Sequence, residues 1–302
     1  MAVTKATFER TPGSLAVGVA ITLAGGTLWG INATISKLLM NNYGADPLWI
    51  ACVREVFAGL LFLALAAATK PRMFVGALKD RRAYPVYLIG AVVCVMATQV
   101  AYLKSIHFTN PGTATVLQSL NLLFVLFWVC LKGRRLPGPR ESVGVALAFG
   151  GVVLLATGGD LTTLKLPLIG LAWGIINAIA TATMSFLPVK AMNRWGNFPV
   201  NGWMFLISGL LLCPFVRPWA TAPQLDATGI AFMVFTVVLG TFGAYWLYMT
   251  GVVRIGAMRA TMLGTSEPVT ATISAVILTG AVFAPTDLAG FAMILAMVFL
   301  VR

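Results

Sequence analysis

Long apolar segments separated by short, charge-bearing loops dominate the hydropathy pattern of this chain. A helix that crosses a bilayer needs about 20 mostly apolar residues, with a range of about 17–25. The pattern therefore predicts ten membrane-spanning helices joined by short connections. The predicted spans are residues 15–39, 47–69, 84–106, 111–131, 141–157, 167–189, 198–216, 227–252, 257–282 and 287–302.

Composition places the chain in the membrane class. Of its 302 residues, 59% are hydrophobic and 10% are charged, whereas soluble proteins carry about 25% charged residues. This much apolar surface predicts an all-α integral membrane protein whose solvent is the lipid bilayer. The first apolar segment is too long for a signal-peptide core, so we interpret it as a spanning helix.

The net charge of +12 does not indicate a nucleic-acid partner. The basic residues occupy short loops between apolar segments, which is the pattern of loop charges that sets membrane orientation. Sixteen Lys and Arg residues fall on one side of the predicted bundle, and both termini are expected there, in the cytoplasm. Those sixteen are Lys5, Arg10, Lys70, Arg72, Lys79, Arg81, Arg82, Lys132, Arg134, Arg135, Arg140, Lys190, Arg194, Arg254, Arg259 and Arg302. Four fall on the other side, namely Lys37, Lys104, Lys165 and Arg217.

Two halves of the chain repeat each other. GTLWG at residues 26–30 is echoed by GLAWG at residues 170–174, an offset of 144. Three further pairs share an offset of 146, namely Tyr102 with Tyr248, Ala114 with Ala260, and Gly144 with Gly290.

These offsets predict two five-helix repeats, residues 11–158 and residues 165–302, in one integrated transmembrane domain. Because five is odd, the second repeat must enter the membrane from the opposite side. Inverted repeats of this kind are typical of secondary transporters, whose solute site lies near the midplane between the repeats.

The segment Ser266-Glu267-Pro268 carries the clearest candidate for gating or coupling. Glu267 stands inside an apolar segment, where a carboxylate usually faces a bundle interior or a wet cavity. Pro268 removes a backbone donor and favours a kink. Two roles stay open for Glu267, hydrogen bonding and proton coupling, and the structural alternative is a side chain that only pairs with a neighbouring helix.

Aromatic and amide side chains at membrane depth are the candidates for solute binding. Such groups suit a zwitterion with a ring, because an ammonium can lie over aromatic faces and a carboxylate can meet amide donors. The alternative is that the amides satisfy one another between helices and the tryptophans face lipid. The candidate substrate-binding residues are Trp29, Asn32, Gln99, Tyr102, Gln118, Asn121, Trp173, Asn177, Tyr245 and Tyr248.

Two other charged features are interpreted as structural. Arg54 and Glu55 are adjacent on a helix, so their side chains point about 100° apart and need not pair. Arg54 lies early in its helix, and we expect it to snorkel outward. The Gly26/Gly30 and Gly170/Gly174 pairs predict close helix packing rather than solute contact.

No catalytic, cofactor or metal site is predicted. The sequence has no paired-carboxylate or metal-ligand spacing, and no glycine loop with a lysine that would bind the phosphates of ATP. Its cysteines, Cys52, Cys94, Cys130 and Cys213, lie in apolar segments and are interpreted as small core residues. The chain is therefore not expected to be an enzyme.

The motifs together resemble the drug/metabolite transporter superfamily, in its ten-helix EamA branch. The resemblance rests on the two Trp-Gly pairs, on Arg54 in VREVFAG, on Ser266–Pro268, and on Gly144 and Gly290. The first half departs from the pattern, with Asn121 in place of a glutamate and KGRR at residues 132–135 in place of a Gly-Glu-Arg turn. Within the branch, the chain is most similar to YddG-type aromatic amino-acid exporters.

The resemblance implies a multi-pass protein of the bacterial inner membrane that exports small metabolites by alternating access without ATP. Aromatic or other neutral amino acids are the expected substrates, and a monomer is the expected state. The alternatives are export of drugs or other metabolites, and a receptor or scaffold that transports nothing. Proton coupling and simple facilitated transport both remain open.

Overall fold

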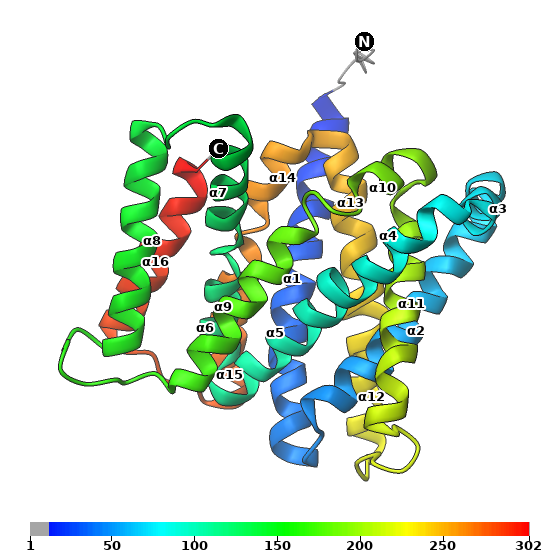
Figure 1. Cartoon of the computed structure of the whole chain (residues 1–302). Helices are drawn as coiled ribbons and strands as arrows, with labels where there is room; N and C mark the ends of the chain where they lie inside the picture. Colours follow the sequence, from blue (N-terminus) through cyan, green and yellow to red (C-terminus); the bar gives the residue numbers. More distant parts are fainter. Residues whose placement is uncertain (1–11, 302) are drawn as a thin grey trace.

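Helices make up all the regular structure of residues 12–301, the part of the chain that the computed structural model describes (Figure 1). Lys5, Arg10 and Arg302, which the charge count includes, lie outside these residues. The first elements are α1 (Pro12–Tyr43), α2 (Pro47–Thr69), α3 (Pro71–Lys79), η1 (Arg81–Ala83), α4 (Tyr84–Ile89), η2 (Gly90–Met96), α5 (Ala97–Phe108), α6 (Pro111–Gln118), α7 (Asn121–Gly133) and α8 (Pro139–Thr157). The remaining elements are α9 (Leu168–Thr183), α10 (Val189–Trp195), α11 (Asn197–Val216), α12 (Ala227–Val237), η3 (Val238–Gly243), α13 (Ala244–Ile255), α14 (Ala257–Leu263), α15 (Ser266–Thr279) and α16 (Pro285–Leu300).

Seven segments of residues 12–301 are long and apolar enough to cross a membrane. They correspond to the first five predicted spans and to those at 198–216 and 227–252. The other three predicted spans differ. Helices α9 and α16 are apolar but shorter, and the span at 257–282 is divided into α14 and α15. The all-helical membrane class is confirmed, and the count of ten crossings stays a prediction.

Two short helices, α3 and α10, were not predicted. The span expected to reach residue 189 ends instead at Thr183, and after an irregular turn Val189 begins α10. Pro188 keeps α9 from continuing into α10, because it has no backbone N–H to donate to the carbonyl four residues earlier. The two short helices meet at Asp80, whose carboxylate accepts a 2.9 Å hydrogen bond from Trp195 Nε1 and lies 3.4 Å from a guanidinium nitrogen of Arg194.

Helices far apart in the sequence pair along their lengths. Helix α2 packs against α11, and α8 packs against α16 at one edge of the bundle (Figure 1). Helix α1 packs on α13 and α15, while α9 packs on α5, α6 and α7. The first helix of each half therefore lies against the third and fourth predicted spans of the other half.

Glycines permit the closest of these approaches. A Cβ on Gly151 of α8 would lie 2.8 Å from the carbonyl oxygen of Gly290 in α16, and a Cβ on Gly209 of α11 would lie 2.7 Å from the backbone nitrogen of Val56 in α2. Small residues that let backbones approach are the usual means of association in lipid, where the bilayer tails are as apolar as the side chains. The buried Cys52, Cys94 and Cys130 each belong to a hydrophobic cluster, as the core interpretation predicts.

Candidate functional site

A central cavity of about 450 Å³ lies where the paired helices meet. Nine of the predicted site residues line it. They are Trp29, Asn32, Gln99, Tyr102, Gln118, Asn121, Tyr245, Tyr248 and Glu267. Its volume is within the range of about 300–1,000 Å³ that small-molecule sites occupy. An adjoining space of about 130 Å³ shares Trp29, Gln118 and Glu267 and adds Pro268 to the lining.

The glycine pair of α1 positions the aromatic wall of this cavity. A Cβ on Gly26 would lie 2.2 Å from the Ser266 hydroxyl oxygen, and one on Gly30 would lie 2.5 Å from the Glu267 carbonyl oxygen. The packing interpretation of these glycines is therefore confirmed. The close approach of α1 places Trp29 beside two rings of α13, with centroid distances of 5.0 Å to Tyr248 and 6.4 Å to Tyr245.

Two π-helical turns present the polar residues of the third and eighth predicted spans. Turn η2 precedes Gln99 and Tyr102, and turn η3 precedes Tyr245 and Tyr248. Such insertions are rare and occur frequently at functional sites, because one extra residue redirects the side chains that follow. In η3, the absence of a side chain at Gly240 makes room for Asn32, whose Cγ would lie 2.3 Å from a Cβ there.

Interrupted helices supply the amide and carboxyl groups. The fourth predicted span breaks between Gln118 and Asn121, and the ninth breaks between Leu263 and Ser266. Broken helices at corresponding places are typical of transporter binding sites, because they expose polar groups at membrane depth.

A hydrogen-bond chain joins these breaks to α9. Gln118 Nε2 donates to Glu267 Oε1 over 3.3 Å, and Gln118 Oε1 accepts from Asn177 Nδ2 over 3.0 Å. Glu267 lies in the first turn of α15, where the positive end of the helix dipole favours an acidic side chain. Pro268 is buried beside it, in the first turn, where a missing backbone donor costs little.

The two α9 residues of the predicted site do not contact the cavity. Gly170, Gly174 and Asn177 face α5 and α6. Asn177 is fully buried behind Gln118 and orients that amide. Trp173 lies beside this buried stripe, is half-buried, and does not line the cavity. Trp173 stands in the motif that matches the one around Trp29, but the packing of α9 determines the direction of its side chain.

Arg54 lines the cavity, although the sequence analysis did not include it among the candidate site residues. The prediction that it snorkels is wrong, because its side chain is 2% exposed and lines the central cavity. It donates a hydrogen bond to Gln99 Oε1. Its neighbour Glu55 points elsewhere and accepts from the Ser208 hydroxyl, as their 100° separation predicts. The sequence did contain a signal for this position, since Arg54 and Glu55 are charged residues within the apolar segment 47–69.

Beyond Asn32 along α1, a lysine ties this helix to the end of α5. Lys37 Nζ donates to the carbonyl oxygens of Ile106, His107 and Thr109, at 3.0, 2.8 and 3.2 Å. An ammonium at these terminal carbonyls is favourable, because they carry the negative end of the helix dipole. The cavity lining extends to Met184, between α9 and α10.

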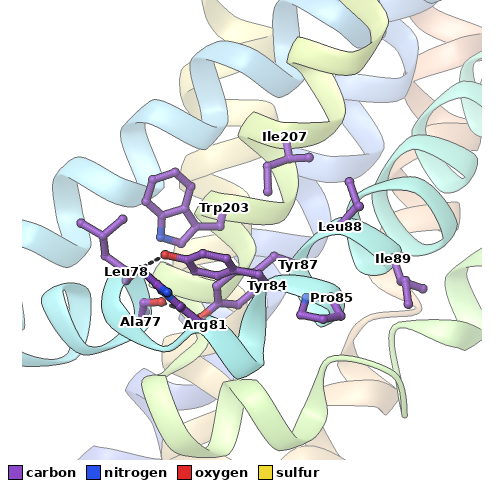
Figure 2. A pocket seen from close by; sticks show the side chains of 10 residues that line it. All are labelled: Ala77, Leu78, Arg81, Tyr84, Pro85, Tyr87, Leu88, Ile89, Trp203 and Ile207. Carbon is purple, nitrogen blue, oxygen red and sulfur yellow. Dashed lines mark hydrogen bonds between the residues drawn. The ribbon is translucent and has the colours of Figure 1, made fainter.

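A second cavity, of about 730 Å³, lies beside α3, α4 and α11 and has a different character (Figure 2). Its lining is apolar and aromatic, with Arg81 as the charged member. Two lining tyrosines are held by backbone carbonyls, Tyr84 by Leu78 at 2.6 Å and Tyr87 by Ala77 at 3.3 Å. It contains none of the predicted site residues, so the central cavity is the candidate solute site.

Comparison with known proteins assigns the family. A sequence model described as the EamA-like transporter family matches the chain over residues 16–157 and 168–302. The chain belongs to the EamA-like transporter family. A Salmonella typhimurium relative, the uncharacterized inner membrane transporter YicL, is 30% identical over 289 residues, which is 96% of each chain. The Bacillus subtilis uncharacterized transporter YwfM is 24% identical, over 88% of this chain and 87% of its own.

The EamA-like fold also agrees with a solved structure. A crystal structure of a protein aligns with 96% of this chain and 97% of that one, with a TM-score of 0.61 and 17% sequence identity. At this identity the likeness concerns the fold alone. Family and relatives together point to a multi-pass membrane transporter rather than an enzyme. The superfamily resemblance is confirmed, and the narrower match to aromatic amino-acid exporters stays a prediction.

Proposed function

We propose that this chain is a secondary transporter of the bacterial inner membrane that exports small amphipathic metabolites by alternating access through the central cavity. Aromatic or other neutral amino acids are the proposed substrates. One observation carries the proposal: aromatic faces from α1 and α13, the amides of Gln118 and Asn121, and the Glu267 carboxyl converge on a single cavity. This combination suits a solute with a ring and a charged head group.

The proposed architecture has ten crossings arranged as two inverted five-helix repeats, with both termini cytoplasmic. The pairing of α2 with α11 and of α8 with α16 supports it, since these are the second and fifth predicted spans of each half. The two segments matched by the family model, residues 16–157 and 168–302, also support it. Helix α9, helix α16 and the α14–α15 pair would each complete one crossing, which with the seven long spans makes ten.

The proposed state of the cavity is open toward the cytoplasm. Its lining reaches Met184 and Met192, next to loops that the charge pattern assigns to that side, while Lys37, which the charge pattern assigns to the opposite side, ties α1 to the end of α5. An exporter in this state would accept solute from inside. Movement of α1 away from the carboxyl end of α5 would then open the outer side.

A counterflow assay tests the proposal. The purified full-length chain is reconstituted into liposomes that are preloaded with unlabelled phenylalanine, tryptophan, leucine or glutamate, and entry of the labelled form is followed. We expect accumulation of the aromatic and neutral amino acids above protein-free liposomes and above liposomes containing Glu267→Leu. If folded wild-type protein exchanges no amino acid but exchanges a cationic dye or another metabolite, the drug or metabolite exporter replaces this function.

A further inference from the structure

Arg54 presents an unmatched cation to the central cavity. A guanidinium stays charged at any physiological pH and carries five donors. Arg54 is 2% exposed, its one observed acceptor is the neutral amide of Gln99, and its Nε has no partner. None of the three ion pairs found within residues 12–301 includes it.

The nearest acid does not neutralise Arg54 by contact. Glu55 follows it in α2, so the two side chains diverge by about 100° around the helix. One Glu55 oxygen accepts from the Ser208 hydroxyl on α11, on the side away from the cavity lining. A buried charge without a contacting counter-ion is costly, and such residues at membrane depth usually serve a solute pathway.

A further donor faces the cavity beside Arg54 without an acceptor. The hydroxyl of Thr98 is buried, lines the cavity and has no hydrogen-bond partner. The Tyr102 hydroxyl is directed toward the Glu267 carboxyl, so the Thr98 hydroxyl and the Arg54 Nε are two cavity donors that lack an acceptor. A carboxylate offers about four acceptor positions and pairs well with a planar guanidinium.

The acidic group lies elsewhere in the same cavity. Glu267 is held by Gln118, close to the rings of Trp29 and Tyr248. Arg54, Tyr102 and Glu267 all line this cavity, so the two charged residues act on the same solute space. The cavity therefore carries a cationic end and an acidic, aromatic end.

Resting on the proposed function, we propose that Arg54 is the carboxylate-binding residue of the central cavity and selects solutes that carry an anionic head group. The ammonium of an amino acid then lies toward Glu267 and the aromatic wall. A solute with the same ring and amine but no carboxylate loses the Arg54 contact.

The test compares phenylalanine with phenylalaninamide, which keeps the ring and amine but has no carboxylate. Counterflow is measured for wild type, Arg54→Met and Arg54→Lys, with Arg72→Gln as the control because Arg72 is exposed on α3. We expect wild type and the control to prefer phenylalanine. Arg54→Met should lose about 10- to 100-fold for phenylalanine and less than about threefold for the amide. Arg54→Lys, which keeps the charge but not the fork, should lie between them.

The outcomes separate this inference from the proposed function. If wild type transports both compounds equally, or if Arg54→Met keeps the wild-type ratio, Arg54 does not bind the carboxylate although amino-acid transport stands. If wild type transports neither compound, the proposed substrate class fails. The subsite is then judged by thermal stabilisation with phenylacetate against phenylacetamide. The subsite is supported if phenylacetate stabilises the wild type, phenylacetamide does not, and Arg54→Met loses the effect. It is overturned if both compounds stabilise the wild type equally or neither does.

Discussion

Gln118 Nε2 donates a 3.3 Å hydrogen bond to Glu267 Oε1, which joins the break between α6 and α7 to the break between α14 and α15. The same Gln118 accepts from Asn177 of α9. Three helices therefore share one polar chain at the cavity, and the carboxyl of the Ser266–Pro268 segment is its end. Because of this hydrogen bond, substitutions of Glu267 that keep or remove the acceptor can distinguish a hydrogen-bonding role from a packing role.

The Gln118 contact predicts how two Glu267 substitutions differ. Glu267→Gln keeps a hydrogen-bonding group for Gln118, so we expect counterflow within about threefold of wild type. Glu267→Leu leaves the Gln118 amide without its acceptor, at a cost of about 1–3 kcal/mol, and should abolish transport. Transport in proteoliposomes measures both. If Glu267→Gln instead loses pH-driven accumulation and keeps counterflow, the carboxyl carries a coupling proton.

The two tryptophans of the repeated motif should behave differently. Trp29 packs against Tyr248 with tilted rings and lines the cavity, whereas Trp173 does not line it. Trp29→Ala should weaken solute affinity by about 5- to 30-fold, equivalent to about 1–2 kcal/mol of lost aromatic contact. Trp173→Ala is the matched control and should keep wild-type affinity. Competition binding on purified protein measures this, and equal losses would contradict the assignment.

Gly30 should tolerate no side chain. An added Cβ would lie 2.5 Å from the Glu267 carbonyl oxygen and 2.8 Å from the Ala271 backbone nitrogen, neither of which can rotate away. We expect Gly30→Ala to lower stability by about 1–3 kcal/mol. The control is Gly133→Ala at the end of α7, where the nearest atom is 3.8 Å away. Thermal unfolding in detergent, followed by size-exclusion chromatography, compares them. Equal melting temperatures would show that α1 can shift without cost.

Lys37 should hold the outer side closed. Lys37→Met removes three ammonium–carbonyl contacts between α1 and the end of α5. A loss of about 1–3 kcal/mol would shift the access equilibrium about 5- to 150-fold toward the outward-open state. We expect faster labelling by an impermeant maleimide from outside at Thr98→Cys, in a background with the four native cysteines replaced by alanine. Lys104→Met is the control, and equal rates for both variants would exclude the latch.

Topology should follow the charge pattern. Reporter fusions at Arg135 should lie in the cytoplasm and fusions at Asp160 outside, because sixteen basic residues against four mark the cytoplasmic side. The two capping carboxylates agree with an inverted repeat, since Glu141 and Asp287 stand 146 positions apart and each accepts from its own helix start, Gly138 at 2.7 Å and Ala284 at 2.9 Å. Fusions at Arg135 and Asp160 on the same side would rule out both the crossing of α8 and the inversion.

By itself, the sequence determined the class of protein and indicated the chemistry of its candidate site. The length of the apolar segments requires helices in a bilayer, because backbone groups have no other partners there. Gly26 and Gly30 indicate a close helix contact, because small residues let helix backbones approach in lipid. The isolated carboxyl of Glu267 indicates a cavity, because exposing a carboxylate to lipid costs free energy. These inferences depend on local chemistry alone.

Only the tertiary structure decided which faces meet. Helices in lipid are apolar all round, so periodicity does not tell which side contacts a neighbour. Arg54 could have reached the membrane surface, but the pairing of α2 with α11 turns it into the cavity. Trp173 repeats the motif of Trp29, but α9 contacts α5 and α6 through its glycines, so the Trp173 ring does not line the cavity. Contacts between helices distant in sequence determine both outcomes, and no local pattern contains them.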